Sequence, residues 1–239
     1  MKKNSFYLFV VLLILSCQAE KQPPTNAAGM TGTERAKPDI NRFKKEIDRF
    51  LESDQQAPRE KGQVLFIGSS SIRMWDSLAV DMAPLEVINR GFGGSTLPEV
   101  IHYADQILFP YAPSTIVLYC GENDISEGAS PLRVFRSFKT LIQEIRQKLP
   151  ETMLYYIPMK PSIARWNLWP DYQKGNEMIA TFIAAHEKME YLDTSPTMLV
   201  DSISIDSSIF IEDGLHMNRA GYERWRDVVR AALITEEAQ

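Results

Sequence analysis

The chain has 239 residues and a formal net charge of −5, with 44% hydrophobic and 24% charged residues. Such a composition supports one buried core and argues against a chain that is disordered throughout. The negative charge excludes general binding to nucleic acid, because that requires a basic surface that displaces counterions from phosphates.

The first residues differ in character from the rest of the chain. Lys2 and Lys3 precede an apolar run, Phe6–Leu15, that is too short to cross a bilayer comfortably and has the layout of a secretory signal. The sequence Ile-Leu-Ser-Cys that ends at Cys17 resembles a bacterial lipobox. We therefore expect residues 1–16 to be a signal peptide and Cys17 to be lipidated, in an exported lipoprotein anchored to a bacterial membrane and facing the periplasm or the cell exterior. An uncleaved membrane anchor and a plain signal peptide are the alternatives.

Residues 17–38 are rich in Pro, Gly, Thr, Ala and Lys and lack periodic apolar positions, which predicts a flexible tether. A single domain is then expected over residues 39–239. With Cys17 lipidated, Cys120 is the only remaining thiol, so no intramolecular disulfide is expected. Apolar residues at helical spacing predict a first amphipathic helix, namely Ile40, Phe43, Ile47, Phe50 and Leu51.

The rest of the chain alternates short apolar runs with amphipathic stretches. Strands are expected near residues 64–67, 87–89, 115–119 and 153–157, with a weaker one near 191–192. Helices are expected at 97–108, 131–149, within 169–188, and at 219–233. This alternation indicates parallel strands joined by helical crossovers, with both faces of the sheet covered. The fold class predicted is α/β, a three-layer α/β/α sandwich.

Polar, glycine-marked segments follow the expected strands. Ligands of open α/β sheets bind beyond the carboxyl ends of the strands, so these segments should meet at one edge. They are Gly68-Ser69-Ser70-Ser71, Gly91-Phe92-Gly93-Gly94-Ser95, Gly121-Glu122-Asn123-Asp124 and, in the last loop, Asp213-Gly214-Leu215-His216.

In their order and context, these segments resemble the motif blocks of the GDSL/SGNH hydrolases, also called GDSL-like lipases or acylhydrolases. The resemblance covers nearly the whole domain, from Gly68 to His216. It implies a parallel, flavodoxin-like five-stranded sheet and ester hydrolysis through a covalent acyl-enzyme on Ser70. The family usually has Asp before the nucleophile, where this chain has Ser69. Ser69 and Ser71 are expected to orient the turn or to cap the following helix.

A serine hydroxyl needs a neighbouring base that removes its proton as it attacks. Of the three histidines, His102 and His186 fall within expected helices, which leaves His216 as the base. Asp213 precedes it by three residues across a glycine-containing turn and is placed to fix the tautomer of its ring. The catalytic residues predicted are therefore Ser70, Asp213 and His216.

The family pattern also implies an oxyanion hole. Its donors would be the backbone N–H groups of Ser70 and Gly94 and the side-chain amide of Asn123. Gly91 and Gly93 are expected to be structural. An Asx turn at Asn123 and a flexible glycine loop are the alternative interpretations.

The candidate substrate-binding residues follow the first and fourth expected strands. Arg73, Trp75, Arg165 and Trp166 combine cationic and aromatic groups that suit a sugar ring or a polar head group. The alternative is that the tryptophans cover the apolar rim of the domain. Cys120 ends an apolar strand and is expected to be a buried, small hydrophobic residue. No metal-ligand spacing and no phosphate-binding loop is present, so neither a metal nor a cofactor is expected.

These observations predict a metal-independent carboxylic ester hydrolase that removes short acyl groups from carbohydrate or other polar substrates, with the acyl length taken from the resemblance. Its partners would be small-molecule or glycan esters, with membrane contact through the N-terminal lipid only. A lysophospholipase-type acylhydrolase is the first alternative, suggested by the anchor, Arg73 and Arg165. A non-catalytic cell-surface binding module is the second, with Ser69 as its only support.

Overall fold

Five strands form the centre of the computed structural model, which describes residues 39–201 and 204–237. The strands are β1 (Val64–Gly68), β2 (Val87–Gly91), β3 (Thr115–Tyr119), β4 (Met153–Tyr156) and β5 (Met189–Tyr191). Their order is β2-β1-β3-β4-β5, and every neighbouring pair is parallel. This is the flavodoxin-like order, so the predicted fold class is confirmed. The predicted signal peptide, Cys17 and the tether lie outside the described residues.

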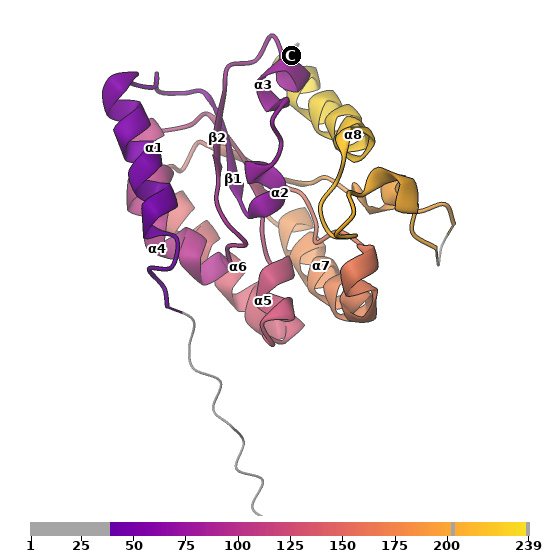
Figure 1. Ribbon diagram of the computed structural model, residues 1–239. Coiled ribbons are helices and arrows are strands. Elements are labelled where there is room, and N and C mark those ends of the chain that lie inside the picture. The colour runs from indigo at the N-terminus through magenta and orange to yellow at the C-terminus, as the bar shows by residue number, and fades with distance from the viewer. Residues whose placement is uncertain (1–38, 202–203, 238–239) are drawn as a thin grey trace, which may run out of the picture. The chain divides into compact units, whose positions relative to one another are not determined.

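Helices cover both faces of the sheet (Figure 1). One face packs against α1 (Lys44–Gln56), α4 (Leu97–Ile107), α6 (Pro131–Lys148) and α7 (Trp169–Ala184). The other packs against α2 (Ser70–Arg73), α3 (Leu78–Met82) and α8 (Arg219–Glu237). The short helix α5 (Glu122–Ser126) follows β3, and short 3₁₀ segments include η2 (Ile163–Leu168) after β4.

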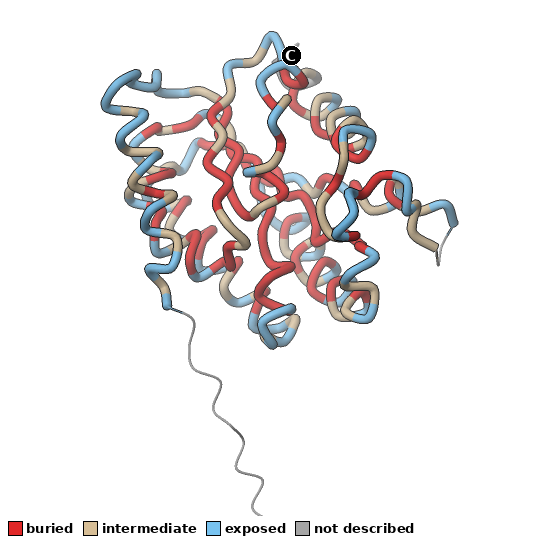
Figure 2. The backbone as a smooth tube through the Cα atoms, in the orientation of Figure 1, coloured by how far each residue is buried: buried red, intermediate tan, exposed pale blue. Residues whose placement is uncertain are grey.

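The sequence of β1 explains why two helical layers are needed. Leu65 and Ile67 belong to one hydrophobic cluster, whereas Phe66 points into the other, and all three side chains are fully buried. A strand with apolar residues on both faces must be covered on both faces. Figure 2 accordingly shows buried backbone at the centre of the sheet, where β1 is buried along its whole length and β3 from its second residue onward.

Helix α4 starts at a well-defined point because its first turn is capped. Glu99 accepts hydrogen bonds from both the backbone N–H and the hydroxyl of Thr96, at 2.8 and 2.9 Å. Together with the bond from the first-turn backbone to the Thr96 side chain, this forms a capping box. The loop between β2 and α4 therefore ends at a rigid point.

Some element ends differ from the prediction. α7 ends at Ala184, so His186 lies in the turn after the helix and not within it. The chain turns there to enter β5, which begins at Met189, two residues before the predicted strand. α3 and α5 were not predicted, and the helix expected after Ser69 was given no bounds, because four or five residues are too few to show a helical period. None of the described helices has the length and apolar character needed to cross a bilayer.

Candidate active site

Loops at the carboxyl edge of the sheet bring the predicted functional residues together. Ser70 begins α2 directly after β1, and Asn123 lies in α5 directly after β3. β1 and β3 are neighbours, with β2 on the outer side of β1 and β4 on the outer side of β3, so the winding of the sheet reverses between them. Ligands of doubly wound sheets bind at such a switch point. The loop before α8 adds Asp213 and His216.

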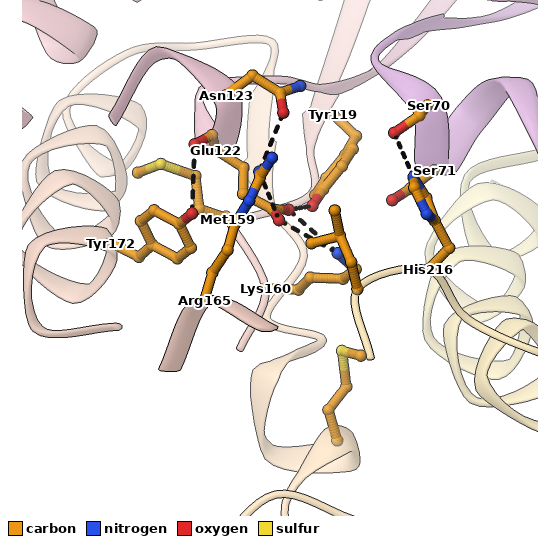
Figure 3. Close-up of polar contacts among 12 residues, drawn as sticks. Ser70, Ser71, Tyr119, Glu122, Asn123, Met159, Lys160, Arg165, Tyr172 and His216 are labelled. Atoms are coloured by element: carbon orange, nitrogen blue, oxygen red, sulfur yellow. Dashed lines mark hydrogen bonds and ion pairs between the residues drawn. The ribbon is translucent and has the colours of Figure 1, made fainter. Parts of the chain in front are cut away.

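Ser70, His216 and Asp213 form a continuous hydrogen-bonded set. The Nε2 atom of His216 lies 2.9 Å from the Oγ atom of Ser70 (Figure 3). The Nδ1 atom of the same ring lies 2.6 Å from Oδ2 of Asp213. Because a carboxylate only accepts hydrogen bonds, Nδ1 carries the proton and Nε2 presents its lone pair to the serine hydroxyl. This is the tautomer that general-base catalysis requires.

The local backbone holds Asp213 in its charged form. Its Oδ1 atom accepts hydrogen bonds from the N–H groups of Leu215 and His216, at 2.8 and 2.9 Å. Partial burial alone would raise the pKa of Asp213, but the hydrogen bonds from His216 and the backbone outweigh it and lower the pKa to about 2. Asp213 is therefore ionised at neutral pH and can stabilise an imidazolium.

The three consecutive serines have distinct environments. Ser69 and Ser71 are each 2% exposed, whereas Ser70 is half-buried. The backbone of Ser69 donates to Tyr119, and the carbonyl of Ser71 accepts from the hydroxyl of Tyr222, at 3.0 and 2.9 Å. The hydrogen bond to His216 is made by Ser70.

Gly94 and the Asn123 side chain lie beside each other. A methyl group placed on Gly94 would lie 3.7 Å from the amide atoms of Asn123. The amide nitrogen of Asn123 donates to the carbonyl of Ser95 at 3.1 Å, which uses one of its two hydrogens. Its oxygen accepts from Nη1 of Arg165 at 3.0 Å. The backbone at Gly94 and an oriented amide are thus brought to the edge of the site.

A buried group of charges lies next to Asn123. Glu122 pairs with Nζ of Lys160 and with Nη1 of Arg165, both at 3.1 Å, and it also accepts a hydrogen bond from the hydroxyl of Tyr119 (Figure 3). The Lys160 and Glu122 side chains are 1% and 4% exposed. Burial, and then the charge of Glu122, raises the pKa of Tyr119, which therefore remains a donor.

Glu122 and Lys160 were not among the predicted site residues. One signal could have found them: they follow β3 and β4, which are neighbouring strands, so opposite charges at their carboxyl ends should meet. An ion pair without solvent access is costly unless it is well paired, and this pair is completed by Arg165 and Tyr119.

The structure places the predicted substrate-binding residues in different surroundings. Arg73 is exposed on α2, 4.0 Å from Glu46, and Trp166 is half-buried and stacks on Trp169. Arg165 is engaged with Glu122 and Asn123, although its side chain remains 19% exposed.

The substrate-binding role predicted for Trp75 is wrong. Trp75 is 1% exposed, its indole N–H donates to Asp81 at 2.7 Å, and its ring packs against Phe66, Tyr222 and Trp225. Both the apolar surface and the polar atom of the ring are therefore used inside the core.

The remaining candidates lie elsewhere. Cys120 is buried, which raises the pKa of its thiol, and it contacts the carbonyl of Ser95. His102 contacts Asn41 on the surface of α4, and His186 contacts the backbone of Phe182. Within residues 39–201 and 204–237, no group of three or more His, Cys, Asp or Glu side chains is arranged to hold a metal ion.

A doubly wound parallel sheet that carries a hydrogen-bonded Ser-His-Asp set at its switch point defines an α/β serine hydrolase. The chain belongs to the GDSL-like lipase/acylhydrolase family, whose model matches residues 68–224, and it is a carboxylic ester hydrolase. The alternative of a non-catalytic binding module does not hold.

Known proteins resemble the chain in sequence and in fold. Over 168 residues it is 26% identical to platelet-activating factor acetylhydrolase IB subunit alpha1 of Pongo abelii, and this region covers 67% of the chain and 70% of the relative. A GDSL-like lipase from Bacteroides thetaiotaomicron superposes with a TM-score of 0.67 at 16% identity, covering 84% of this chain and 100% of that one. A catalytic mutant of an acetylxylan esterase from Geobacillus stearothermophilus has a TM-score of 0.56 at 11% identity, covering 72% and 94%. At these identities the two structures show the fold.

Proposed function

We propose that this protein hydrolyses short-chain acyl esters of carbohydrates or other polar alcohols through an acyl-enzyme on Ser70. The observation that carries the proposal is the contact of 2.9 Å between His216 Nε2 and Ser70 Oγ, with Asp213 on the other ring nitrogen. Removal of the hydroxyl proton by His216 as Ser70 attacks the ester carbonyl is the chemistry that this arrangement supports.

The first half of the reaction forms the acyl-enzyme. Ser70 Oγ bonds to the carbonyl carbon, its proton passes to Nε2 of His216, and the carbonyl oxygen becomes an oxyanion. We assign the backbone N–H groups of Ser70 and Gly94, and the free amide hydrogen of Asn123, as its donors. The proton on His216 then passes to the alcohol oxygen as the carbon–oxygen bond to the alcohol breaks.

The second half releases the acid. Water takes the place of the alcohol, His216 accepts one of its protons, and the hydroxide adds to the acyl carbonyl. Collapse of this intermediate returns the proton to Ser70 Oγ and frees the carboxylic acid. Asp213 keeps the ring in one tautomer throughout and stabilises its cationic form.

The acyl length is supported by the names of two relatives. Platelet-activating factor acetylhydrolase and acetylxylan esterase both refer to acetyl groups, and the second also refers to a polysaccharide. We therefore assign acetyl or similarly short acyl groups on a polar alcohol as the substrate class.

A lysophospholipase-type activity is the second candidate, and one observation favours it. Ile163 and Ile211 are 47% and 41% exposed, and both adjoin the turn that carries Asp213 and His216. Ile211 donates its N–H to the carbonyl of His216 at 2.9 Å, and Ile163 packs against Gly214. Exposed apolar side chains next to the turn that carries His216 would suit a longer acyl chain.

One assay separates these functions. We expect the wild type to hydrolyse 4-nitrophenyl acetate with a higher kcat/KM than the butyrate and octanoate esters, and Ser70→Ala to lose turnover on all three. Acetylated xylo-oligosaccharide and lysophosphatidylcholine then serve as competing natural-type substrates. A preference for octanoate and lysophosphatidylcholine would replace the first proposal by the second, and full activity of Ser70→Ala would contradict both.

We also propose that Cys17 carries a lipid that holds the protein at a bacterial membrane, facing the periplasm or the cell exterior. The charged start, the apolar run and the small residue before Cys17 support this proposal. In detergent phase partitioning of cell extracts, we expect the wild type in the detergent phase and Cys17→Ser in the aqueous phase. The same aqueous partitioning for both proteins would contradict the anchor.

A further inference from the structure

We propose that Arg42, Phe43 and Glu46 are positioning residues that hold the oxyanion loop, defined as Gly93–Ser95, in its reactive conformation. This inference rests on the proposed function, in which the N–H of Gly94 binds the oxyanion. The three residues lie at the N-terminal end of α1, and α1 runs alongside α4 (Figure 1).

The oxyanion loop has little conformational preference of its own. Gly93 and Gly94 are consecutive glycines, and Gly93 has a positive φ of 37°. A glycine pair loses more conformational entropy on ordering than other residues do. An oxyanion donor accelerates the reaction only when its direction is set before charge develops, so contacts from outside the loop must supply the order.

Glu46 and Arg42 bracket the Gly93–Gly94 peptide. The N–H of Gly93 donates to Oε2 of Glu46 at 3.0 Å, and the carbonyl of Gly94 accepts from Nη2 of Arg42 at 3.5 Å. The first contact is made by the peptide group that precedes the Gly93–Gly94 peptide, and the second by the peptide group that follows it. The N–H of Gly94 belongs to the peptide between them, so these two contacts restrict its direction.

Phe43 prevents the loop from moving toward α1. A methyl group placed on Gly93 would lie 1.9 Å from Cε1 of Phe43, which means that the ring rests directly on this glycine. The ring is held in turn by an edge-to-face contact with Phe92 at 5.5 Å and by the guanidinium of Arg42 at 4.7 Å. Glycine is thus required at position 93 for close contact as well as for its φ.

Arg42 also ties this segment to the elements on either side of the loop. Its guanidinium contacts both carboxylate oxygens of Glu99, at 2.6 and 2.9 Å, and Glu99 closes the capping box with Thr96. The same guanidinium contacts Glu127, directly after α5, at 2.8 Å. A bidentate pair between a guanidinium and a buried carboxylate is directional, so the start of α1 has a fixed position relative to α4 and α5.

The opposite side of the loop is held by the hydrolase core. Ser95 donates its hydroxyl to the carbonyl of Gly68 at 3.1 Å and accepts from Asn123 at its own carbonyl. The loop is therefore contacted both by the core and by Arg42, Phe43 and Glu46. They precede residue 68, where the match to the family model begins, so part of the catalytic geometry depends on a segment upstream of the matched region.

Two matched variants on α1 test the inference. Glu46→Ala removes the acceptor for Gly93, whereas Glu46→Gln keeps a carbonyl oxygen that accepts the same N–H. Asp48→Ala is the control, because Asp48 lies on the same helix and forms an exposed ion pair with Lys44. The measurements are kcat and KM for 4-nitrophenyl acetate, the inhibition constant of phenylboronic acid, and the melting temperature. The boronate forms a tetrahedral adduct with a serine nucleophile and places an oxygen in the oxyanion hole.

We expect Glu46→Ala to lower kcat about tenfold, less than the loss of a complete donor, with KM changed less than about twofold. Phenylboronic acid should bind it more weakly by a factor similar to the loss in kcat/KM. Glu46→Gln should keep most of the activity, and Asp48→Ala should match the wild type. Phe43→Leu, which keeps an apolar contact of smaller area, should show a smaller loss in kcat without a change in KM.

Two results would overturn the inference: equal kcat values in Glu46→Ala and Asp48→Ala, or equal losses in Glu46→Ala and Glu46→Gln. Failure of the proposed function is distinguished in the same experiment by the wild type and Ser70→Ala. If the wild type has no Ser70-dependent turnover, the proposed function fails. If the wild type has Ser70-dependent turnover and Glu46→Ala has the same kcat as the wild type, only the inference about Arg42, Phe43 and Glu46 fails.

Discussion

The amide of Asn123 is oriented by two neighbours of opposite hydrogen-bonding character. A guanidinium only donates hydrogen bonds and a backbone carbonyl only accepts them, so Arg165 must face the amide oxygen and Ser95 must face the amide nitrogen. The second amide hydrogen then has one direction left. At the scale of single residues, Arg165 therefore contacts Asn123, while Glu122 pairs with Arg165 and is itself paired with Lys160.

We expect Arg165→Met to lower kcat about tenfold with little change in KM, because Asn123 loses its orientation while the substrate loses no contact. Asn123→Ala should lower kcat by about a hundredfold or more, as the loss of one oxyanion donor does in other enzymes. Steady-state kinetics with 4-nitrophenyl acetate measures both effects, with circular dichroism as the check on folding.

The double variant is the control for this prediction. If Arg165 acts only through Asn123, Arg165→Met combined with Asn123→Ala should be no slower than Asn123→Ala alone. Additive losses would contradict the prediction. A raised KM with unchanged kcat in Arg165→Met would return Arg165 to the direct substrate-binding role expected from the sequence.

At the scale of elements, the first four strands and the long helices were predicted well, whereas the short helices were not. β3 and the first residues of α4 and α6 agree with the sequence-based ranges. α2 and α5, which carry Ser70 and Asn123, are too short to have a period of their own. The first helix also differs from the prediction, because α1 begins at Lys44 and the residues before it form a turn. That turn brings Arg42 and Phe43 to the oxyanion loop.

At the scale of the whole molecule, burial of Asp124 links protonation to folding. Asp124 is 6% exposed, and burial, which outweighs the hydrogen bond from the N–H of Leu97, raises its pKa to about 7. In the unfolded chain the pKa of an aspartate is about 3.9. Between about pH 4 and pH 7 the unfolded chain therefore loses this proton while the folded protein keeps it, so ionisation favours unfolding as the pH rises.

We expect Asp124→Asn to remove this contribution. The free energy of unfolding of the wild type should decrease by on the order of 3 kcal/mol between pH 4 and pH 7. A difference of one pKa unit between the folded and unfolded states corresponds to about 1.4 kcal/mol. The asparagine variant should lack it, because its amide oxygen accepts from Leu97 without ionising. Urea unfolding at pH 4.5 and pH 7.5 measures the difference.

Asp105→Asn is the matched control, since Asp105 is 77% exposed and pairs with Lys148 on the surface. Its pH dependence should equal that of the wild type. An equal pH dependence in wild type and Asp124→Asn would show that Asp124 does not carry the effect.

Asp81, whose pKa is lowered to about 2, contributes to stability in a different pH range. Burial opposes this shift, but the hydrogen bonds from Arg219, Trp75 and Ser77 outweigh it, so its contribution is present above about pH 4 and lost below.

The sequence by itself determined the fold class, and it predicted the set of Ser70, His216 and Asp213 that the structure brings into hydrogen-bonding contact. Continuous apolar strands alternating with amphipathic helices allow few arrangements, and the carboxyl ends of parallel strands must lie at one edge. Glycine-marked polar segments at those ends therefore had to meet. Asp213 and His216 are close in the chain as well, so their contact depends on one local turn.

Only the tertiary structure decided which side chains support the triad. Trp75 and Arg165 each combine apolar and polar surface, and composition does not say whether such a residue faces a ligand or the core. Packing placed Trp75 in the core and placed Arg165 against Asn123. The contact of Glu46 with Gly93 joins residues 47 positions apart. Contacts of this kind depend on how helices pack on the sheet, which no local pattern of residues encodes.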